Sequence, residues 1–274
     1  MIIEFFGPAA AGKTTMASAV TAWLRDNGHS VRLISSYRPA ERAPDIPAAR
    51  GTGAVRRLVR AAGEMAALLR DGSIHPEDAH MTNGLLRLLP PRQAVWKLRM
   101  HQYIARLSSN WRSASSEGGI TLIDQGFLQA VYSLAVLTGH DRQTRLGDAI
   151  GLVPMPDLLV RLHVSDDVLA VRLADRRLRQ GRLERLLEIR PAANLASVPI
   201  FNIIDTLVAS RGVPVLRTEP SGDRQFDGIF REVESAVLAG MACGRQPVAR
   251  RADPSQAEGR TRLDAGKAEA ADVR

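Results

Sequence analysis

The sequence has little that would suit a disulfide-stabilised or membrane-spanning protein. Cys243 is its only cysteine, which excludes an internal disulfide and a cysteine-based metal cluster. The most apolar long segment, Phe127 to Leu137, is too short to cross a bilayer and contains Gln129. Met1 leads directly into an apolar stretch, without the charged region of a secretory signal. We therefore expect a protein of the reducing cytoplasm that does not use a membrane as a partner.

Aromatic residues and lysines are also scarce. Aromatics make up 4% of the residues, too few for an obvious base-stacking surface, so nucleic acid is an unfavoured partner. The net charge of +8 comes almost entirely from arginine, because Lys13, Lys97 and Lys267 are the only lysines. Two interpretations of this charge stay open: a general bias towards arginine and alanine, and a positive cleft for an anionic nucleotide. The sequence also leaves the oligomeric state open, and a homodimer is one of the states it allows.

The most specific motif lies at the start of the chain. An apolar strand over 2–6 is followed by the pattern G-x-x-x-x-G-K-[ST] and then by a helix over 13–26. In such a loop, backbone N–H groups surround phosphate oxygens, the lysine spans the β- and γ-phosphates, and the hydroxyl of the next residue can ligate Mg²⁺. The alternative is an ordinary glycine turn between a strand and a helix. The residues expected to bind the nucleotide are Gly7, Ala9, Ala10, Ala11, Gly12, Lys13, Thr14 and Thr15.

Strands and helices alternate along most of the chain, which predicts an α/β domain over 1–240. Strands are expected at 30–35, 120–124, 158–164 and 213–218. A helical insertion is expected at 54–116, with breaks at Asp71-Gly72 and Pro90-Pro91. Further helices are expected at 127–139, 141–150, 166–178, 192–211 (interrupted at Pro199) and 224–239. The segment 242–274 has no periodicity and is expected to be a disordered tail.

Asp124 ends the predicted strand that follows the insertion. In phosphate-loop enzymes an acid at this place holds a Mg²⁺-bound water or takes the proton of an attacking hydroxyl. Asp124 is therefore a candidate catalytic residue and, together with Thr14, a candidate metal-site residue. The alternative is a carboxylate that only terminates a strand.

Arginines gather in two further segments. The run over 172–190 is a candidate lid, in which Arg176 and Arg182 would stabilise the charge of a transferring phosphoryl group. Acidic residues such as Asp175 are interspersed, as on an ordinary solvated helix, so that interpretation stays open. The loop over 37–53 leaves the second predicted strand, and it is either a substrate loop with Arg38 as an anion contact or a surface loop.

The order of these elements resembles the thymidylate kinase and deoxynucleoside kinase group. The resemblance rests on the phosphate loop, the strand ending Leu-Ile-Asp-Gln-Gly, the strand after Pro156-Asp157 and the arginine-rich segment from Val171, and it covers roughly 1–240. It implies a three-layer P-loop NTPase fold with a five-stranded parallel sheet, a helical insertion and an arginine-rich lid. It also implies ATP as phosphate donor, Mg²⁺, and catalysis by Asp124.

One departure from that group concerns the acceptor. The group has arginine after the acid of the third strand, where this chain has Gln125, which becomes a candidate substrate residue. The leading hypothesis is a Mg-ATP-dependent kinase of a small hydroxyl-bearing or anionic acceptor. The second is an ATP-binding regulatory or assembly protein with little turnover. A guanine-nucleotide switch is disfavoured because no Asn-Lys-x-Asp motif occurs, and a nucleic-acid motor because no second motor motif is recognisable.

Overall fold

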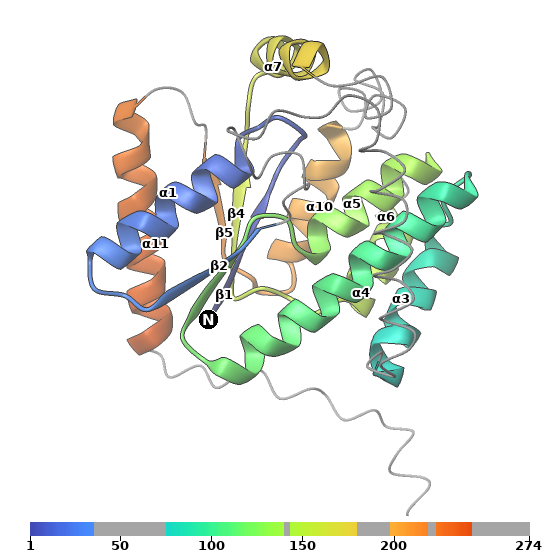
Figure 1. Ribbon diagram of the computed structural model, residues 1–274, viewed down its shortest axis with the longest axis horizontal. Coiled ribbons are helices and arrows are strands. Elements are labelled where there is room, and N and C mark those ends of the chain that lie inside the picture. The colour runs from blue at the N-terminus through green and yellow to red at the C-terminus, as the bar shows by residue number, and fades with distance from the viewer. Residues whose placement is uncertain (36–74, 140–142, 180–197, 219–222, 243–274) are drawn as a thin grey trace, which may run out of the picture. The chain divides into compact units, whose positions relative to one another are not determined.

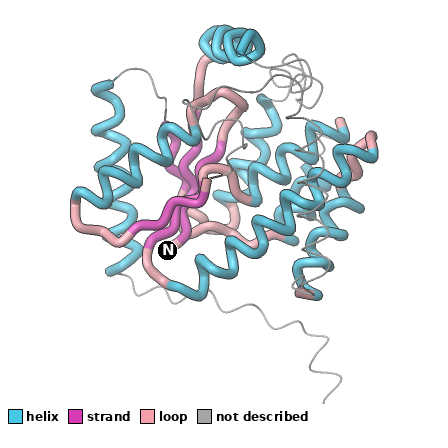
Figure 2. Tube along the Cα trace, in the orientation of Figure 1, coloured by secondary structure: helices cyan, strands magenta, loops and turns pink. Residues whose placement is uncertain are grey.

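Five parallel strands form the centre of the structure, a computed structural model that describes residues 1–35, 75–139, 143–179, 198–218 and 223–242. The sheet order is β2-β3-β1-β4-β5, and every neighbouring pair is parallel. The strands are β1 (Ile2–Phe6), β2 (Val31–Ile34), β3 (Ile120–Ile123), β4 (Leu158–Leu162) and β5 (Val215–Thr218). Figure 2 shows them as a single twisted layer. Residues 1–239 form one compact unit, and of the second unit, residues 240–274, only the helical residues 240–242 are described.

β1 is the central strand, and all five of its residues are buried. A strand covered on both faces needs apolar side chains on both, which explains why its sequence does not alternate between apolar and polar residues. Its side chains still alternate in direction. Ile3 and Phe5 contribute to one hydrophobic cluster, and Ile2 and Phe6 contribute to the other.

Helices cover both faces of the sheet, which gives three layers (Figure 1). One face packs against α1 (Lys13–Asp26) and α11 (Asp223–Ala242). The opposite face packs against a larger group of helices: α3 (Pro76–Leu88), α4 (Ala94–Glu117), α5 (Phe127–Thr138), α6 (Gln143–Leu152) and α10 (Val198–Ala209). α7 (Asp166–Arg179) follows β4.

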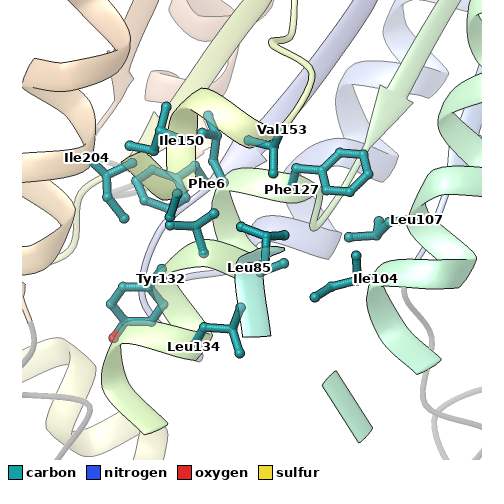
Figure 3. Close-up of a cluster of buried hydrophobic side chains, with 14 of the residues drawn as sticks. Phe6, Leu85, Ile104, Leu107, Phe127, Tyr132, Leu134, Ile150, Val153 and Ile204 are labelled. Atoms are coloured by element: carbon teal, nitrogen blue, oxygen red, sulfur yellow. The ribbon is translucent and has the colours of Figure 1, made fainter. Parts of the chain in front are cut away.

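The core on the α5 side is built around aromatic rings. Phe6 of β1 lies edge-on to Phe201 of α10, with ring centroids 4.8 Å apart, and Tyr132 of α5 stacks on the same Phe201. Figure 3 shows Phe6 and Tyr132 among the aliphatic side chains of this cluster. Because rings from three elements interlock, α5 and α10 are fixed against the middle of the sheet.

The expected fold class is confirmed: the chain has the three-layer P-loop NTPase fold, with β1 and α1 bounded as predicted. The part of the insertion that the structure describes forms α3 and α4, on either side of the Pro90-Pro91 break. Its first segment, the loop over 37–53 and the tail 243–274 lie outside the described residues. Among the described residues, no helix has the length and apolar character needed to cross a membrane.

The helix expected over 192–211 is described only from Val198, where α10 begins, and Pro199 is the second residue of α10. A proline fits the first turn of a helix because the first N–H groups there have no intrahelical partner. Residues 192–197 lie outside the described residues, so the interruption expected at Pro199 stays a prediction.

Candidate active site

Parallel strands bring their carboxyl ends to one edge of the sheet, and the candidate site lies at that edge. β1 leads there into the phosphate loop, and its neighbour β3 leads into Asp124. Glu4 of β1 is paired with Ile123 of β3, so the loop and Asp124 leave the sheet side by side. Two segments more than a hundred residues apart in sequence thus meet because their strands are adjacent.

The phosphate loop turns sharply before α1 begins. The Ala11 N–H donates to the Pro8 carbonyl at 3.2 Å, which closes a tight turn, and Ala10 has a φ of 64°. A non-glycine residue in this left-handed region is strained, and such strain often accompanies functional loops. Gly7 is required for room, because a Cβ there would lie 2.8 Å from the carbonyl oxygen of Leu162 on β4.

Lys13 is the first residue of α1, and its side chain is buried against the loop. Its Nζ donates to the carbonyls of Gly7 at 2.8 Å and Pro8 at 2.7 Å. The ammonium group therefore lies across the base of the loop. Lys13 is the only lysine in the first 96 residues, and the fold places its positive charge at the predicted phosphate loop.

Thr14 and Asp124 meet directly. The Thr14 hydroxyl donates to Oδ2 of Asp124 at 2.9 Å, and Asp124 is 1% exposed. A hydroxyl and a carboxylate beside a phosphate loop are hard oxygen donors, which suit Mg²⁺. The described residues contain no cluster of three or more His, Cys, Asp or Glu side chains that could hold a metal alone. The donor set thus fits an ion that takes its remaining ligands from phosphate and water, as Mg²⁺ usually does.

Gln125 follows Asp124 and is held by the helical insertion. The Tyr103 hydroxyl on α4 donates to the Gln125 backbone carbonyl at 3.0 Å. The insertion therefore reaches the segment that carries the candidate acid. Arg38, the other predicted substrate residue, lies outside the described residues.

The predicted lid begins within α7, which continues to Arg179. Arg172 of this helix points its Nη1 at the Ala11 carbonyl of the phosphate loop, at 3.5 Å. Arg172 belongs to the predicted arginine run, in which Arg176 and Arg182 are the candidate catalytic residues. The side chain of Arg176 and all of Arg182 lie outside what the structure describes, so their roles stay predictions.

Glu4 and Gln129 support the site but were not among the predicted site residues. Glu4, in the middle of β1, is fully buried, and its Oε1 accepts hydrogen bonds from N–H groups at the start of α5. Burial raises the pKa of Glu4 to about 8, although the neighbouring N–H groups of 126–129 act to lower it. Gln129 of α5 accepts a hydrogen bond from the Gly7 N–H at 3.4 Å. The sequence feature that could have identified Glu4 is an acidic residue within an otherwise apolar strand.

Solved kinase structures are similar to this chain. A deoxyadenosine kinase from M. mycoides with dCMP and a flexible dCDP matches with a TM-score of 0.47 at 15% identity, over 86% of this chain and all of that one. A thymidylate kinase from Ehrlichia chaffeensis matches with a TM-score of 0.40 at 11% identity, over 86% of this chain and 98% of that one. Both belong to the group that the sequence resembles. No protein-family model and no curated protein matches the sequence. Likeness at these values does not extend to activity.

Proposed function

We propose that this protein is a Mg-ATP-dependent kinase that transfers the γ-phosphoryl group of ATP to a small hydroxyl-bearing or anionic acceptor of the nucleoside or nucleotide type. The observation that carries the proposal is the hydrogen bond between Thr14 and Asp124 at the mouth of the phosphate loop. It joins a candidate metal ligand to a candidate acid, so the phosphates of ATP, Mg²⁺ and the hydroxyl of an acceptor could meet at one place.

The donor half of the site would work through charge and position. Lys13 would exchange the carbonyls of Gly7 and Pro8 for β- and γ-phosphate oxygens, since an ammonium group gains more from an anion than from a neutral carbonyl. When bound, Mg²⁺ would neutralise charge on the phosphates, with Thr14 and Asp124 as the residues that hold it or its water. Arg172 lies beside the loop and would add positive charge there, in addition to any contribution from Arg176 and Arg182.

The acceptor half would lie beyond Asp124. This carboxylate would hold the metal water or take the proton of the acceptor hydroxyl. Gln125 is neutral, so it would position an acceptor by hydrogen bonds and would not pair with acceptor charge. Its backbone is fixed by Tyr103 of the insertion, which supports a role of α4 in shaping this half of the site.

The proposed reaction uses no cysteine, and the sequence has only one. We therefore propose that the reaction runs in the reducing cytoplasm.

The test is γ-phosphate transfer from labelled ATP to pooled nucleosides, nucleotides and sugars. We expect the wild type to label at least one pool and Asp124→Asn to lower the rate at least about 100-fold, as for loss of a general base. Asp148→Asn on α6, which removes an exposed carboxylate, is the matched control and should keep the wild-type rate. If the wild type binds ATP but labels no pool, the kinase proposal is wrong and an ATP-binding regulatory protein is the better description.

A further inference from the structure

Glu4 is an acid in a position where the rest of the strand is apolar. It lies in the middle of the central strand, between Ile3 and Phe5, and is 0% exposed. A buried carboxyl group is costly unless its environment compensates for the lost hydration. Its contacts therefore indicate what the group does, because an apolar residue would satisfy the sheet equally well.

The carboxyl group of Glu4 caps α5. Its Oε1 accepts hydrogen bonds from the N–H groups of Leu128 at 2.9 Å and Gln129 at 3.2 Å. The first N–H groups of a helix lack intrahelical partners, and usually the N-cap side chain satisfies them. Here the N-cap residue is Gly126, which has no side chain to do so. A residue of β1 thus replaces the missing cap, and it joins α5 to the strand that carries the phosphate loop.

The close approach of the Glu4 side chain also explains why residue 126 is a glycine. A Cβ at this position would lie 2.4 Å from Cδ and 2.5 Å from Oε2 of Glu4, and the three heavy atoms nearest to it all belong to Glu4. Its φ of −103° lies outside the left-handed region that favours glycine, so φ does not explain the glycine here. Gly126 is therefore needed for the room it leaves to Glu4.

The contact between Glu4 and α5 affects both the phosphate loop and Asp124. Asp124 lies two residues before the N-cap of α5, so the position of the first turn of the helix sets the position of Asp124. From the same turn, Gln129 accepts the Gly7 N–H at the start of the phosphate loop. One carboxyl group thus holds a helix that contacts the loop at one point and carries the candidate acid at another.

We propose that Glu4 is a positioning residue, whose contact with Gly126, Leu128 and Gln129 fixes Asp124 at hydrogen-bond distance from Thr14. The proposal rests on the proposed function, since it explains how the site for Mg-ATP is held together. It also makes a separate structural claim about α5, which can be measured without nucleotide.

The first experiment measures the affinity for ATP with Mg²⁺ and with a chelator, by calorimetry on the full chain. We expect Mg²⁺ to tighten binding in the wild type, and Glu4→Ala to remove most of that gain, as Asp124→Asn does, at a cost of about tenfold in metal-dependent affinity. Glu4→Gln keeps an oxygen that can accept both N–H bonds, so it should retain the gain. Val208→Ala, a buried change on α10, controls for loss of stability and should also retain it.

The second experiment uses hydrogen exchange without nucleotide. The amides of Leu128 and Gln129 should exchange faster in Glu4→Ala than in the wild type and Glu4→Gln. Gly126→Ala should lower the melting temperature strongly in the wild type but far less in Glu4→Ala, because the side chain that it meets is gone.

These outcomes separate the two proposals. If the wild type does not bind ATP, the proposed function fails, whereas the exchange data still test the position of α5. If Glu4→Ala keeps both the wild-type gain from Mg²⁺ and the wild-type exchange rates, the role of Glu4 is overturned. Additive effects of Gly126→Ala and Glu4→Ala on the melting temperature would overturn the pairing of these two residues.

Discussion

The two faces of the central sheet are built differently. Towards α1 and α11, the strand residues of β1, β3 and β4 are all apolar: Ile3, Phe5, Ile120, Leu122, Leu158, Val160 and Leu162. Towards α5 and α10, the same strands present Glu4 and Arg161 among their apolar residues, and both are buried. Among the described residues, the buried side chains of β1, β3 and β4 meet the first face by hydrophobic contact, whereas on the other face Glu4 and Arg161 add hydrogen bonds from a strand side chain to a helix.

Arg161 of β4 joins the sheet to a helix by hydrogen bonds, as Glu4 of β1 does. Its guanidinium donates to Asp205 at 2.5 Å and to Asn202 at 2.6 Å, both on α10. Arg217 of β5 donates to the same Asp205 through Nε at 2.9 Å. Hydrophobic contact has no preferred direction, whereas a buried hydrogen bond from a strand side chain fixes where a helix lies. The face with buried polar side chains is the one that carries α5, the helix that follows Asp124.

The largest effect is expected from breaking the ion pair on this face. Asp205→Ala removes the shared acceptor and leaves the guanidinium of Arg161 buried without its partner. We expect a loss of about 3–5 kcal/mol of unfolding free energy, as for other broken buried pairs, measured by urea denaturation.

The matched variant replaces both charges of that pair. Arg161→Met with Asp205→Leu should recover most of the loss, because apolar residues of similar size often replace a buried pair without cost. Arg217 can then turn to water, since its side chain is already 59% exposed. A double variant as unstable as Asp205→Ala would show that directional bonds themselves hold this face together.

A smaller, pH-dependent effect is expected at Glu4. Burial raises its pKa from 4.5 to about 8. The stabilisation from the protonated group is fully present below about pH 4.5 and is lost as the pH rises through about 8. Glu4→Gln cannot ionise, so relative to it the wild type should lose stability across this window, on the order of a few kcal/mol. Urea unfolding at a series of pH values, without metal or nucleotide, measures the difference. Parallel curves for the two proteins would contradict the assignment.

The smallest effect is expected on the apolar face. Ile3→Val, next to Glu4 on the same strand but facing α1, removes one buried methylene-sized group and should cost about 1 kcal/mol. This cost should be the same at each pH, because no ionisable group is involved. A cost that varies with pH would mean that the two faces are coupled through β1, which would contradict the difference described between them.

Much of the fold follows from local sequence. The apolar run of β1, the glycines of the loop and the Asn27-Gly28 stop of α1 act within a few residues, and their predicted bounds are those of the structure. The interruption expected at Pro199 stays a prediction, because the residues before Val198 lie outside what the structure describes.

The site was predictable only in part, for a related reason. Lys13 and Thr14 belong to a contiguous motif, and Asp124 was found from its place at a strand end. The roles of Glu4 and Gln129 depend on the contact of β1 with α5, more than a hundred residues later. Arg172 likewise approaches the loop only because β4 lies next to β1 and directs α7 towards the site.

The sequence by itself determined the phosphate loop, the alternation of strands and helices, and the acid at the end of the third strand, because each depends on neighbours in the chain. Tertiary structure decided that Asp124 meets Thr14, that Glu4 caps α5 and that Gly126 leaves room for it. Those features depend on which strands lie side by side and which way each side chain points, and both are settled only when the two faces of the sheet are covered.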